Sequence, residues 1–236
     1  MELSKRLQAV ANLVTAGYRI ADIGTDHAYI PIYLVENQIA PSAIAMDINR
    51  GPVERAREHV LQSGLDGRID VRLSDGMKNL MPQEADAAVI AGMGGSLMMK
   101  ILKESWDVTV SLKECILQPQ SEIARFRTFL LEKGFFILQE EMVLDDGKYY
   151  PMMKAAPPSC DTKMQQGWSK TELLYGKKLL EMQHPVLRRY LEKEERRIHR
   201  ILEGLEGQSS EKTRQRRGEL TEELELVRKG MEYYEV

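Results

Sequence analysis

Short apolar runs alternate with amphipathic segments along residues 1–155. The runs have the length of β-strands, and the segments between several of them carry apolar residues at helical spacing. Alternation of this kind predicts a parallel sheet covered by helices. The predicted strands cover residues 19–24, 43–47, 69–75, 86–92, 114–118, 135–144 and 149–155.

The segments between the strands predict helices over residues 30–38, 52–64, 96–104 and 121–134. In the last of these, Ser121 suits the N-cap and Gly134 suits a left-handed stop. The final two strands are separated only by Asp145-Asp146-Gly147-Lys148, which predicts a hairpin with an Asp-Gly turn. Five βα units followed by an antiparallel hairpin resemble the seven-stranded sheet of class I methyltransferases, a Rossmann-like α/β fold.

The pattern changes to helix throughout after a polar, proline-containing linker at 156–167. One helix is expected over residues 170–182. A second is expected from Pro185, which suits a first helical turn, to about Glu206.

A heptad seam follows, because five apolar residues recur at spacings of 4, 3, 4 and 3, namely Leu220, Leu224, Val227, Met231 and Tyr234. The short connection makes the two long helices antiparallel neighbours. We therefore predict an α/β domain at 1–157 and an all-helical coiled-coil domain at 158–236. The heptads fit an intramolecular or a dimeric coiled coil, and we favour a monomer.

Composition limits the class of protein. The 236 residues are 43% hydrophobic, which is too apolar for a disordered chain. No window approaches the ~20 apolar residues of a membrane span, and residues 1–14 are typical of an amphipathic helix, not of a signal peptide. Two cysteines are too few for a disulfide framework or a Cys-rich zinc site. We expect a cytoplasmic protein without a metal or membrane contact, with Cys115 and Cys160 as ordinary thiols.

Charge is unevenly distributed along the chain. The net charge of −3 argues against a strong, general nucleic-acid binder. Residues 163–217 nevertheless carry 14 basic and 8 acidic side chains, whereas residues 1–157 carry 17 and 21. Such a block suggests a local surface for an anionic partner. The alternative is a solvated helical face on which Arg and Glu pair four residues apart.

The segment from Asp22 to Pro31 is the richest in chemistry, since a strand ends there in an acidic residue and Gly24 before a helix begins. Gly24 permits close approach of a ligand, and the helix N-terminus offers N–H donors. A dinucleotide site requires GxGxxG, but Asp26 replaces the second glycine and adds charge where pyrophosphate would lie. S-adenosylmethionine fits better, with Asp22 neutralising its ammonium group. The alternative is that both aspartates only cap the turn and helix.

Further candidates end the next three strands. Asp47 is placed to accept hydrogen bonds from both ribose hydroxyls, or to cap the following helix. Asp75 is placed to accept the adenine amine with Gly76 leaving room for the ring, although Asp-Gly is a common turn. Gly92-Met93-Gly94-Gly95 would let a flat target base approach, with Met93 packing on it, or would form only a tight turn. The (Asp/Asn)-Pro-Pro-aromatic motif of many adenine N6 methyltransferases is absent from the sequence.

GTDHAYIP, the Asp47 and Asp75 strand ends, VIAGMGG and the DDGKYYP hairpin together resemble the bacterial TrmK family of tRNA (adenine-N1)-methyltransferases. The resemblance covers residues 1–155, and members of that family also end in a coiled-coil-like domain. It implies a class I fold, S-adenosylmethionine as donor, and tRNA as substrate, modified at the adenine at the base of the D-loop.

The strand ends, the glycine-rich loop and the cationic helix supply candidate residues for three roles. The cofactor would contact Asp22, Gly24, Thr25, His27, Asp47, Ile48, Asp75, Gly76, Gly92 and Met93. The tRNA would contact Gly94, Gly95, Arg188, Arg189, Arg196, Arg197 and Arg200. The catalytic candidates are Asp26 and Tyr29.

The expected mechanism needs little acid–base help, because adenine N1 is uncharged and has a free lone pair. The enzyme must align that lone pair with the methyl group. Methylation leaves a cationic base, which Asp26 would stabilise, with Tyr29 stacking or hydrogen bonding and His27 facing the cofactor. A paired adenine must first be exposed by flipping, since N1 lies on its Watson–Crick edge.

Two other functions remain open from the sequence. The glycines at 92–95 also suit a methyltransferase that acts on ribosomal RNA, protein or a small molecule. A non-catalytic protein that uses the coiled coil for assembly is the other alternative. The intact set of Asp22, Gly24, Asp47 and Asp75 counts against it.

Overall fold

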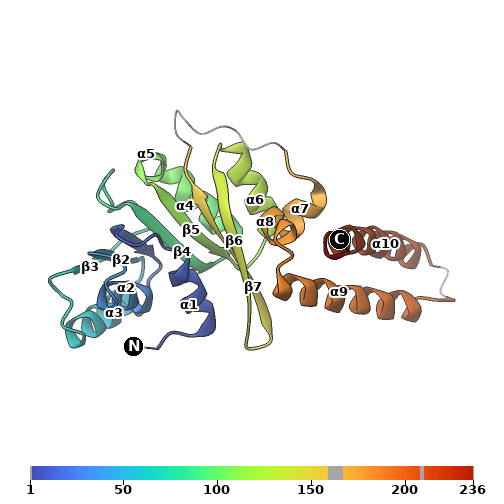
Figure 1. The fold of residues 1–236 in the computed structure, drawn as a ribbon, viewed down its shortest axis with the longest axis horizontal. Coiled ribbons are helices and arrows are strands. Elements are labelled where there is room, and N and C mark those ends of the chain that lie inside the picture. The colour runs from blue at the N-terminus through green and yellow to red at the C-terminus, as the bar shows by residue number, and fades with distance from the viewer. Residues whose placement is uncertain (1, 159–166, 208–209, 236) are drawn as a thin grey trace. The chain divides into compact units, whose positions relative to one another are not determined.

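The computed structural model describes residues 2–158, 167–207 and 210–235. The chain divides into two compact units, Met1–Gln166 and Gly167–Val236. The first unit is a single mixed sheet with helices on both faces, and the second is entirely helical (Figure 1). Among the described residues, no helix is long and apolar enough to cross a membrane.

The sheet has seven strands in the order β3-β2-β1-β4-β5-β7-β6. Only β7 runs antiparallel to its neighbours, β5 and β6. All seven predicted strands are confirmed, and their ends shift by at most two residues. They are β1 (Ile20–Ile23), β2 (Ala43–Asp47), β3 (Ile69–Leu73), β4 (Ala87–Met93), β5 (Glu114–Pro119), β6 (Phe136–Asp145) and β7 (Lys148–Ala156).

The described part of the first unit contains six helices. They are α1 (Lys5–Asn12), α2 (Tyr29–Glu36), α3 (Arg50–Gln62), α4 (Gly95–Glu104), α5 (Trp106–Ser111) and α6 (Ile123–Glu132). The first three cover one face of the sheet, and the other three pack together on the opposite face.

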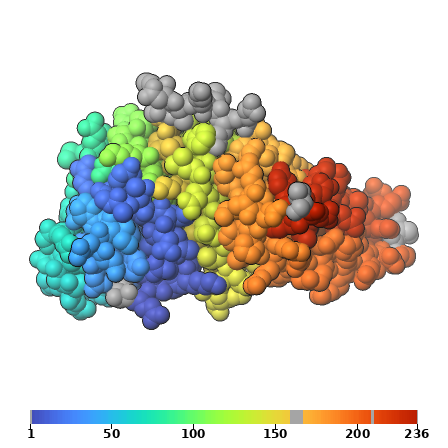
Figure 2. Space-filling model, in the orientation of Figure 1, coloured from blue at the N-terminus to red at the C-terminus, as the bar shows by residue number. Residues whose placement is uncertain are grey.

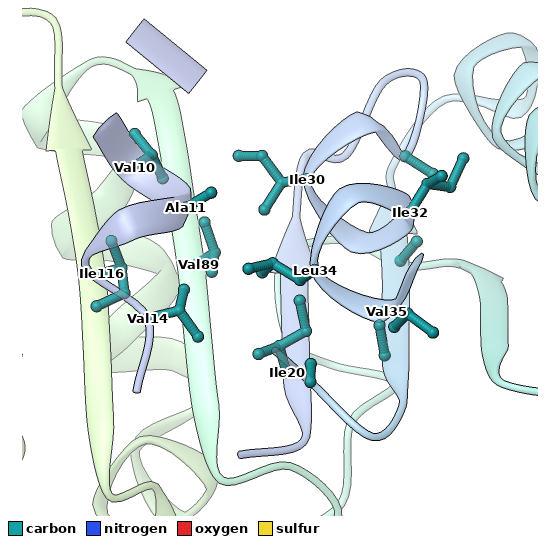
Figure 3. Close-up of a cluster of buried hydrophobic side chains, with 14 of the residues drawn as sticks. Val10, Ala11, Val14, Ile20, Ile30, Ile32, Leu34, Val35, Val89 and Ile116 are labelled. Atoms are coloured by element: carbon teal, nitrogen blue, oxygen red, sulfur yellow. The ribbon is translucent and has the colours of Figure 1, made fainter. Parts of the chain in front are cut away.

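The core under α1 and α2 follows from the strand pattern. Strands β1, β2 and β5 are buried at every position, as expected for strands covered on both sides. Successive side chains of a strand alternate between faces, so Ala87 and Val89 of β4 both point toward α1 and α2. Figure 3 shows Val10 and Ala11 of α1 packing over Val89 and Ile116 on this face.

The β6–β7 hairpin has the predicted Asp-Gly turn. Asp145 pairs with Lys148, while Asp146 and Gly147 adopt positive φ angles of 45° and 72°, as a type I′ turn requires. Helix α1 is attached to this hairpin, because the backbone N–H of Arg6 donates to the Asp145 carboxylate at 3.0 Å. Figure 2 shows the dark-blue N-terminal residues lying against the yellow hairpin.

Two local expectations in the first unit are wrong, and one helix was not expected. Ser121 does not cap α6: the cap position is Glu122, which has a positive φ of 53° and makes no capping bond. Instead the Ser121 carbonyl accepts the Gly95 N–H at 3.1 Å, so this residue connects two helices. The third βα unit has no helix, since residues 74–86 form turns. Helix α5 was not expected. Gly134 does adopt the predicted left-handed conformation, with φ of 80°.

The second unit contains α7 (Lys170–Tyr175), α8 (Lys177–Glu181), α9 (Pro185–Gly204), α10 (Glu211–Met231) and a short 3-10 helix, Glu232–Tyr234. The single helix predicted over 170–182 is wrong, because Gly176 breaks it with φ of 94°. Pro185 opens α9 as expected.

Helices α9 and α10 are antiparallel neighbours. Glu195 pairs with Arg228, and Arg197 pairs with Glu223, so the partner number falls as the α9 number rises. The buried apolar side chains of the two helices are Leu187, Leu191, Ile198, Leu220, Leu224 and Val227.

Candidate active site

A pocket of about 340 Å³ opens where the carboxyl ends of β1 and β4 meet helices α1 and α2. Seven residues predicted for the site line it, namely Asp22, Gly24, Thr25, Asp26, His27, Tyr29 and Gly92. Five further residues complete the lining, which are Arg6, Leu7, Ile30, Ala91 and Gln120. The pocket thus combines carboxylates from one wall with an arginine from another.

Asp22 lies buried at the end of β1, with 5% of its surface exposed. The pKa of Asp22 is raised to about 7, mainly by burial. The hydroxyl of Thr25, which donates to the carboxylate at 2.6 Å, lowers the pKa, and the charge of Asp47 raises it. The turn is held because the N–H groups of Gly24 and Thr25 donate to the Met46 carbonyl at 2.8 and 2.9 Å. Such a carboxyl group is poised to ionise beside a bound cation.

Asp26 and Tyr29 are exposed at the pocket mouth. The Asp26 carboxylate pairs with Arg55 at 3.0 Å and with Nε2 of His27 at 3.4 Å. The rings of His27 and Tyr29 stack with centroids 5.1 Å apart. Nδ1 of His27 is buried without a hydrogen-bond partner among the described residues.

The ends of β2 and β3 lie at the same carboxyl edge of the sheet, outside the pocket lining. Asp47 is 9% exposed, and its Oδ1 accepts the Asn49 N–H at 2.8 Å. Ile48 is 59% exposed, which leaves an apolar surface beside that carboxylate.

Asp75 and Gly76 follow β3. Asp75 pairs with Lys78, and this ion pair lowers the pKa of the Asp75 carboxyl. Gly76 has φ of 61°, and a Cβ there would lie 3.1 Å from Ile101. The turn and its packing therefore account for this glycine without a ligand, and a cofactor contact stays a prediction.

The glycine after β1 and the two glycines after β4 have packing roles. A Cβ on Gly24 would overlap the terminal methyl group of Met93, so that methionine fills the space expected for a ligand at Gly24. A Cβ on Gly95 would lie 2.7 Å from the Ser121 carbonyl oxygen, and Gly94 is the N-cap of α4. Contact of Gly94 and Gly95 with substrate stays a prediction.

Sequence reasoning missed Arg6 and Gln120. Nη1 of Arg6 donates to the buried Gln118 side chain at 3.0 Å, and the guanidinium lies over the Tyr150 ring. Arg6 Nη1 and Gln120 Nε2 lie 3.5 and 3.7 Å from the point where a Cβ of Gly92 would stand. Two donors thus lie beside Gly92, whose φ of 81° favours glycine at this position. No spacing along the chain indicates this, since Arg6 belongs to a separate helix.

The candidate arginines of α9 fall into two groups. Arg188 pairs with Glu192 at 3.2 Å, and Arg197 pairs with Glu194 and Glu223 at 2.8 and 3.4 Å. The other group, Arg189, Arg196 and Arg200, is exposed and forms no ion pair with any residue that the structure describes. Spacings of seven and four place the second group on one face of the helix.

Two further expectations concern metals and thiols. Within the described ranges no cluster of His, Cys, Asp or Glu side chains could hold a metal ion. Cys115 is a free thiol inside β5, and burial raises its pKa to about 12, so it is unreactive. Cys160 lies outside the described residues.

Comparison with known proteins identifies the family. Residues 3–153 match the model of a methyltransferase domain. A tRNA (adenine(22)-N(1))-methyltransferase of Bacillus subtilis is 33% identical over 234 residues, which are 99% of this chain and 98% of that protein. The chain belongs to the TrmK family.

Solved TrmK structures share the fold. The crystal structure of the B. subtilis m1A22 tRNA methyltransferase TrmK has a TM-score of 0.83 and 34% identity, covering 98% of this chain and 99% of that one. TrmK of M. capricolum, in complex with S-adenosyl-homocysteine, has a TM-score of 0.83 and 28% identity, covering 99% of each chain. The resemblance to TrmK and the class I methyltransferase fold are confirmed.

Proposed function

We propose that this TrmK-family chain transfers a methyl group from S-adenosylmethionine to N1 of adenine 22 in tRNA. The observation that carries the proposal is the relationship to the B. subtilis enzyme over both units of the chain. A match to the methyltransferase domain alone would leave the substrate open.

The chemistry of the pocket fits the cofactor. The amino-acid end of S-adenosylmethionine carries an ammonium and a carboxylate group, and the pocket offers Asp22 for the first and Arg6 with Gln120 for the second. Asp47 is available for the ribose hydroxyls, and the exposed Ile48 offers apolar contact to the adenine ring. When bound, the cofactor supplies an electrophilic methyl group on its sulfonium.

Asp26 and Tyr29 act on the target base. Tyr29 is 36% exposed, so its ring can stack on a flipped adenine and hold N1 in line for transfer. The Asp26 carboxylate stabilises the positive charge that methylation places on the base. A general base is unnecessary, because N1 carries no proton at neutral pH.

The second unit is proposed to bind tRNA as a coiled-coil domain. The exposed arginines 189, 196 and 200 would contact phosphates, which positions RNA without reading its sequence. We assign catalysis to residues 1–157 and tRNA positioning to residues 158–236, and we propose a monomer.

Incubation with bulk tRNA and methyl-labelled cofactor, followed by nucleoside analysis, tests this function. The expected product is 1-methyladenosine. Label on ribosomal RNA, protein or a small molecule instead would move the chain to another methyltransferase class. Absence of S-adenosylmethionine binding at millimolar concentration would indicate a non-catalytic assembly protein.

Cofactor affinity is expected to rise with pH. Only ionised Asp22 attracts the ammonium group, and its pKa of about 7 means that the ionised fraction grows from about one tenth at pH 6 to about nine tenths at pH 8. Calorimetry with S-adenosylhomocysteine, which has the same amino-acid end, should show about tenfold tighter binding at pH 8 than at pH 6. In Asp22→Asn this rise should vanish. A flat profile in the unmodified protein would remove Asp22 from the ammonium site.

Asp47→Ala is expected to weaken cofactor binding by about 1–3 kcal/mol, the range from an ordinary hydrogen bond to one with a charged group. The reason is that Asp47 ends β2 with a carboxylate facing the proposed ribose site. Affinity is measured by calorimetry and the fold by thermal melting. Unchanged affinity in a variant that melts like the parent would refute the ribose assignment.

A further inference from the structure

Helix α3 contacts the proposed catalytic turn, residues 26–29, through two side chains that the pocket chemistry does not use. Arg55 and His59 are four residues apart and therefore lie on the same face of α3. Nη2 of Arg55 lies 3.0 Å from Oδ1 of Asp26. Nδ1 of His59 lies 3.1 Å from the backbone carbonyl oxygen of His27, which can only accept a hydrogen bond, so His59 donates.

His59 also belongs to a cluster of three rings. Its centroid lies 5.3 Å from that of His27 and 5.6 Å from that of Tyr29, with interplanar angles of 20° and 17°. Tyr29 is exposed, whereas His59 is only partly exposed, so the imidazole beside it limits the orientations that the Tyr29 ring can adopt.

The 26–29 turn needs such support. Asp26 and Ala28 both have side chains yet adopt positive φ angles of 50° and 57°. Non-glycine residues persist in this region only where surrounding contacts over-determine the conformation. The Ala28 N–H donates to the Thr25 carbonyl at 3.0 Å, and the Ala28 carbonyl accepts the Ile32 N–H of α2 at 2.9 Å. Arg55 and His59 of α3 add contacts to Asp26 and to the His27 backbone.

We propose that Arg55 and His59 are positioning residues, which hold the 26–29 turn in the conformation that presents Asp26 and Tyr29 to the target adenine. This inference rests on the proposed function of that turn. Arg55 holds one oxygen of Asp26 while His27 lies beside the other, so the carboxylate is oriented before the positive charge develops. Preorientation of this kind is what makes electrostatic stabilisation effective in a transition state.

A competing interpretation makes the opposite prediction. If Arg55 merely offset the negative charge of Asp26, removal of Arg55 would let the carboxylate stabilise the cationic base more strongly, and turnover would rise. If it positions Asp26, its removal lowers turnover. Arg57 provides a matched control, because it is an exposed arginine on another flank of α3 and, among the residues that the structure describes, donates only to the Val71 carbonyl.

The kinetic arm is a double-mutant cycle on tRNA methylation. Arg55→Gln is expected to lower kcat about tenfold, with KM for both substrates within twofold, and Arg55→Lys should restore most of the loss. In an Asp26→Asn background, Arg55→Gln should change kcat less than twofold, since it acts through that carboxylate. His59→Leu should also lower kcat about tenfold, whereas Arg57→Gln should not.

The second arm does not depend on activity. Hydrogen exchange at the Ala28 amide is expected to be at least tenfold faster in Arg55→Gln and in His59→Leu, and unchanged in Arg57→Gln. Melting temperatures and cofactor affinities near those of the parent establish that each variant is folded.

Three outcomes would overturn the inference: a higher kcat in Arg55→Gln, an equal loss in both Asp26 backgrounds, or unchanged exchange at Ala28 in both α3 variants. Failure of the proposed function is distinguishable. In that case the parent protein itself would not methylate tRNA, and the exchange arm would still decide whether α3 holds the turn.

Discussion

Replacing Arg189, Arg196 and Arg200 together by glutamine is expected to lower tRNA affinity about 100-fold, which corresponds to roughly 1 kcal/mol for each of three arginine–phosphate hydrogen bonds. The three arginines share one exposed face of α9, opposite the buried Leu187 and Leu191. They also lack ion-pair partners among the described residues, so their charges are available to RNA.

Salt dependence separates phosphate binding from other effects. Removing one arginine that binds a phosphate should lower the slope of log affinity against log salt by about one unit. Binding is measured at several salt concentrations in the full-length protein, and cofactor affinity should stay unchanged because the pocket lies in the other unit.

A matched control replaces three exposed arginines that already have acidic partners. Arg188, Arg214 and Arg216 pair with Glu192, Glu211 and Glu219, so their replacement should cost much less affinity. If both triple variants bind tRNA like the parent while the mass in solution changes, the second unit is an assembly device. Equal reductions of affinity in the two triples would show a response to net charge alone.

Asp26→Asn is expected to lower kcat about 100-fold while cofactor affinity changes less than twofold. The carboxylate is proposed to act on charge that appears only during methyl transfer, so its removal affects the transition state and not the bound ground state. Reductions of this size are typical when one preoriented electrostatic group is removed. Single-turnover methylation and calorimetry measure the two quantities.

The control is Asp66→Asn, an exposed aspartate that precedes β3 at the opposite edge of the sheet. It should behave like the parent protein. If Asp26→Asn instead weakens cofactor binding as much as turnover, Asp26 belongs to the cofactor site and the stabilising role is wrong.

The strands could be predicted because a strand buried on both faces is a continuous apolar run, as in Ala43–Asp47. The same logic places Asp22 and Asp47 at one sheet edge, since parallel strands share their carboxyl ends. The hairpin turn was equally predictable, because a type I′ turn favours the local pair Asp146-Gly147.

Interactions between distant segments could not be predicted. Arg6 enters the pocket from a helix that precedes β1, and its orientation depends on Gln118 and Tyr150. Arg55 and His59 reach the 26–29 turn from α3, which follows β2. These positions follow from how helices pack on the sheet, which no periodicity records.

The cationic block at 163–217 illustrates both what the sequence predicts and what it does not. Counting residues shows an excess of cations over 163–217, but not which of them remain available. Arg197 faces Glu223 only because α9 and α10 pack antiparallel. The available arginines could be distinguished only once the helix pair was known.

Site-resolved methylation of a defined tRNA tests the central claim most directly. Two transcripts are compared that differ only at position 22, one with adenine and one with guanine. We expect one labelled methyl group per adenine-22 transcript, recovered as 1-methyladenosine, and none on the guanine-22 transcript. Equal labelling of both transcripts, or label in a different nucleoside, would contradict the account.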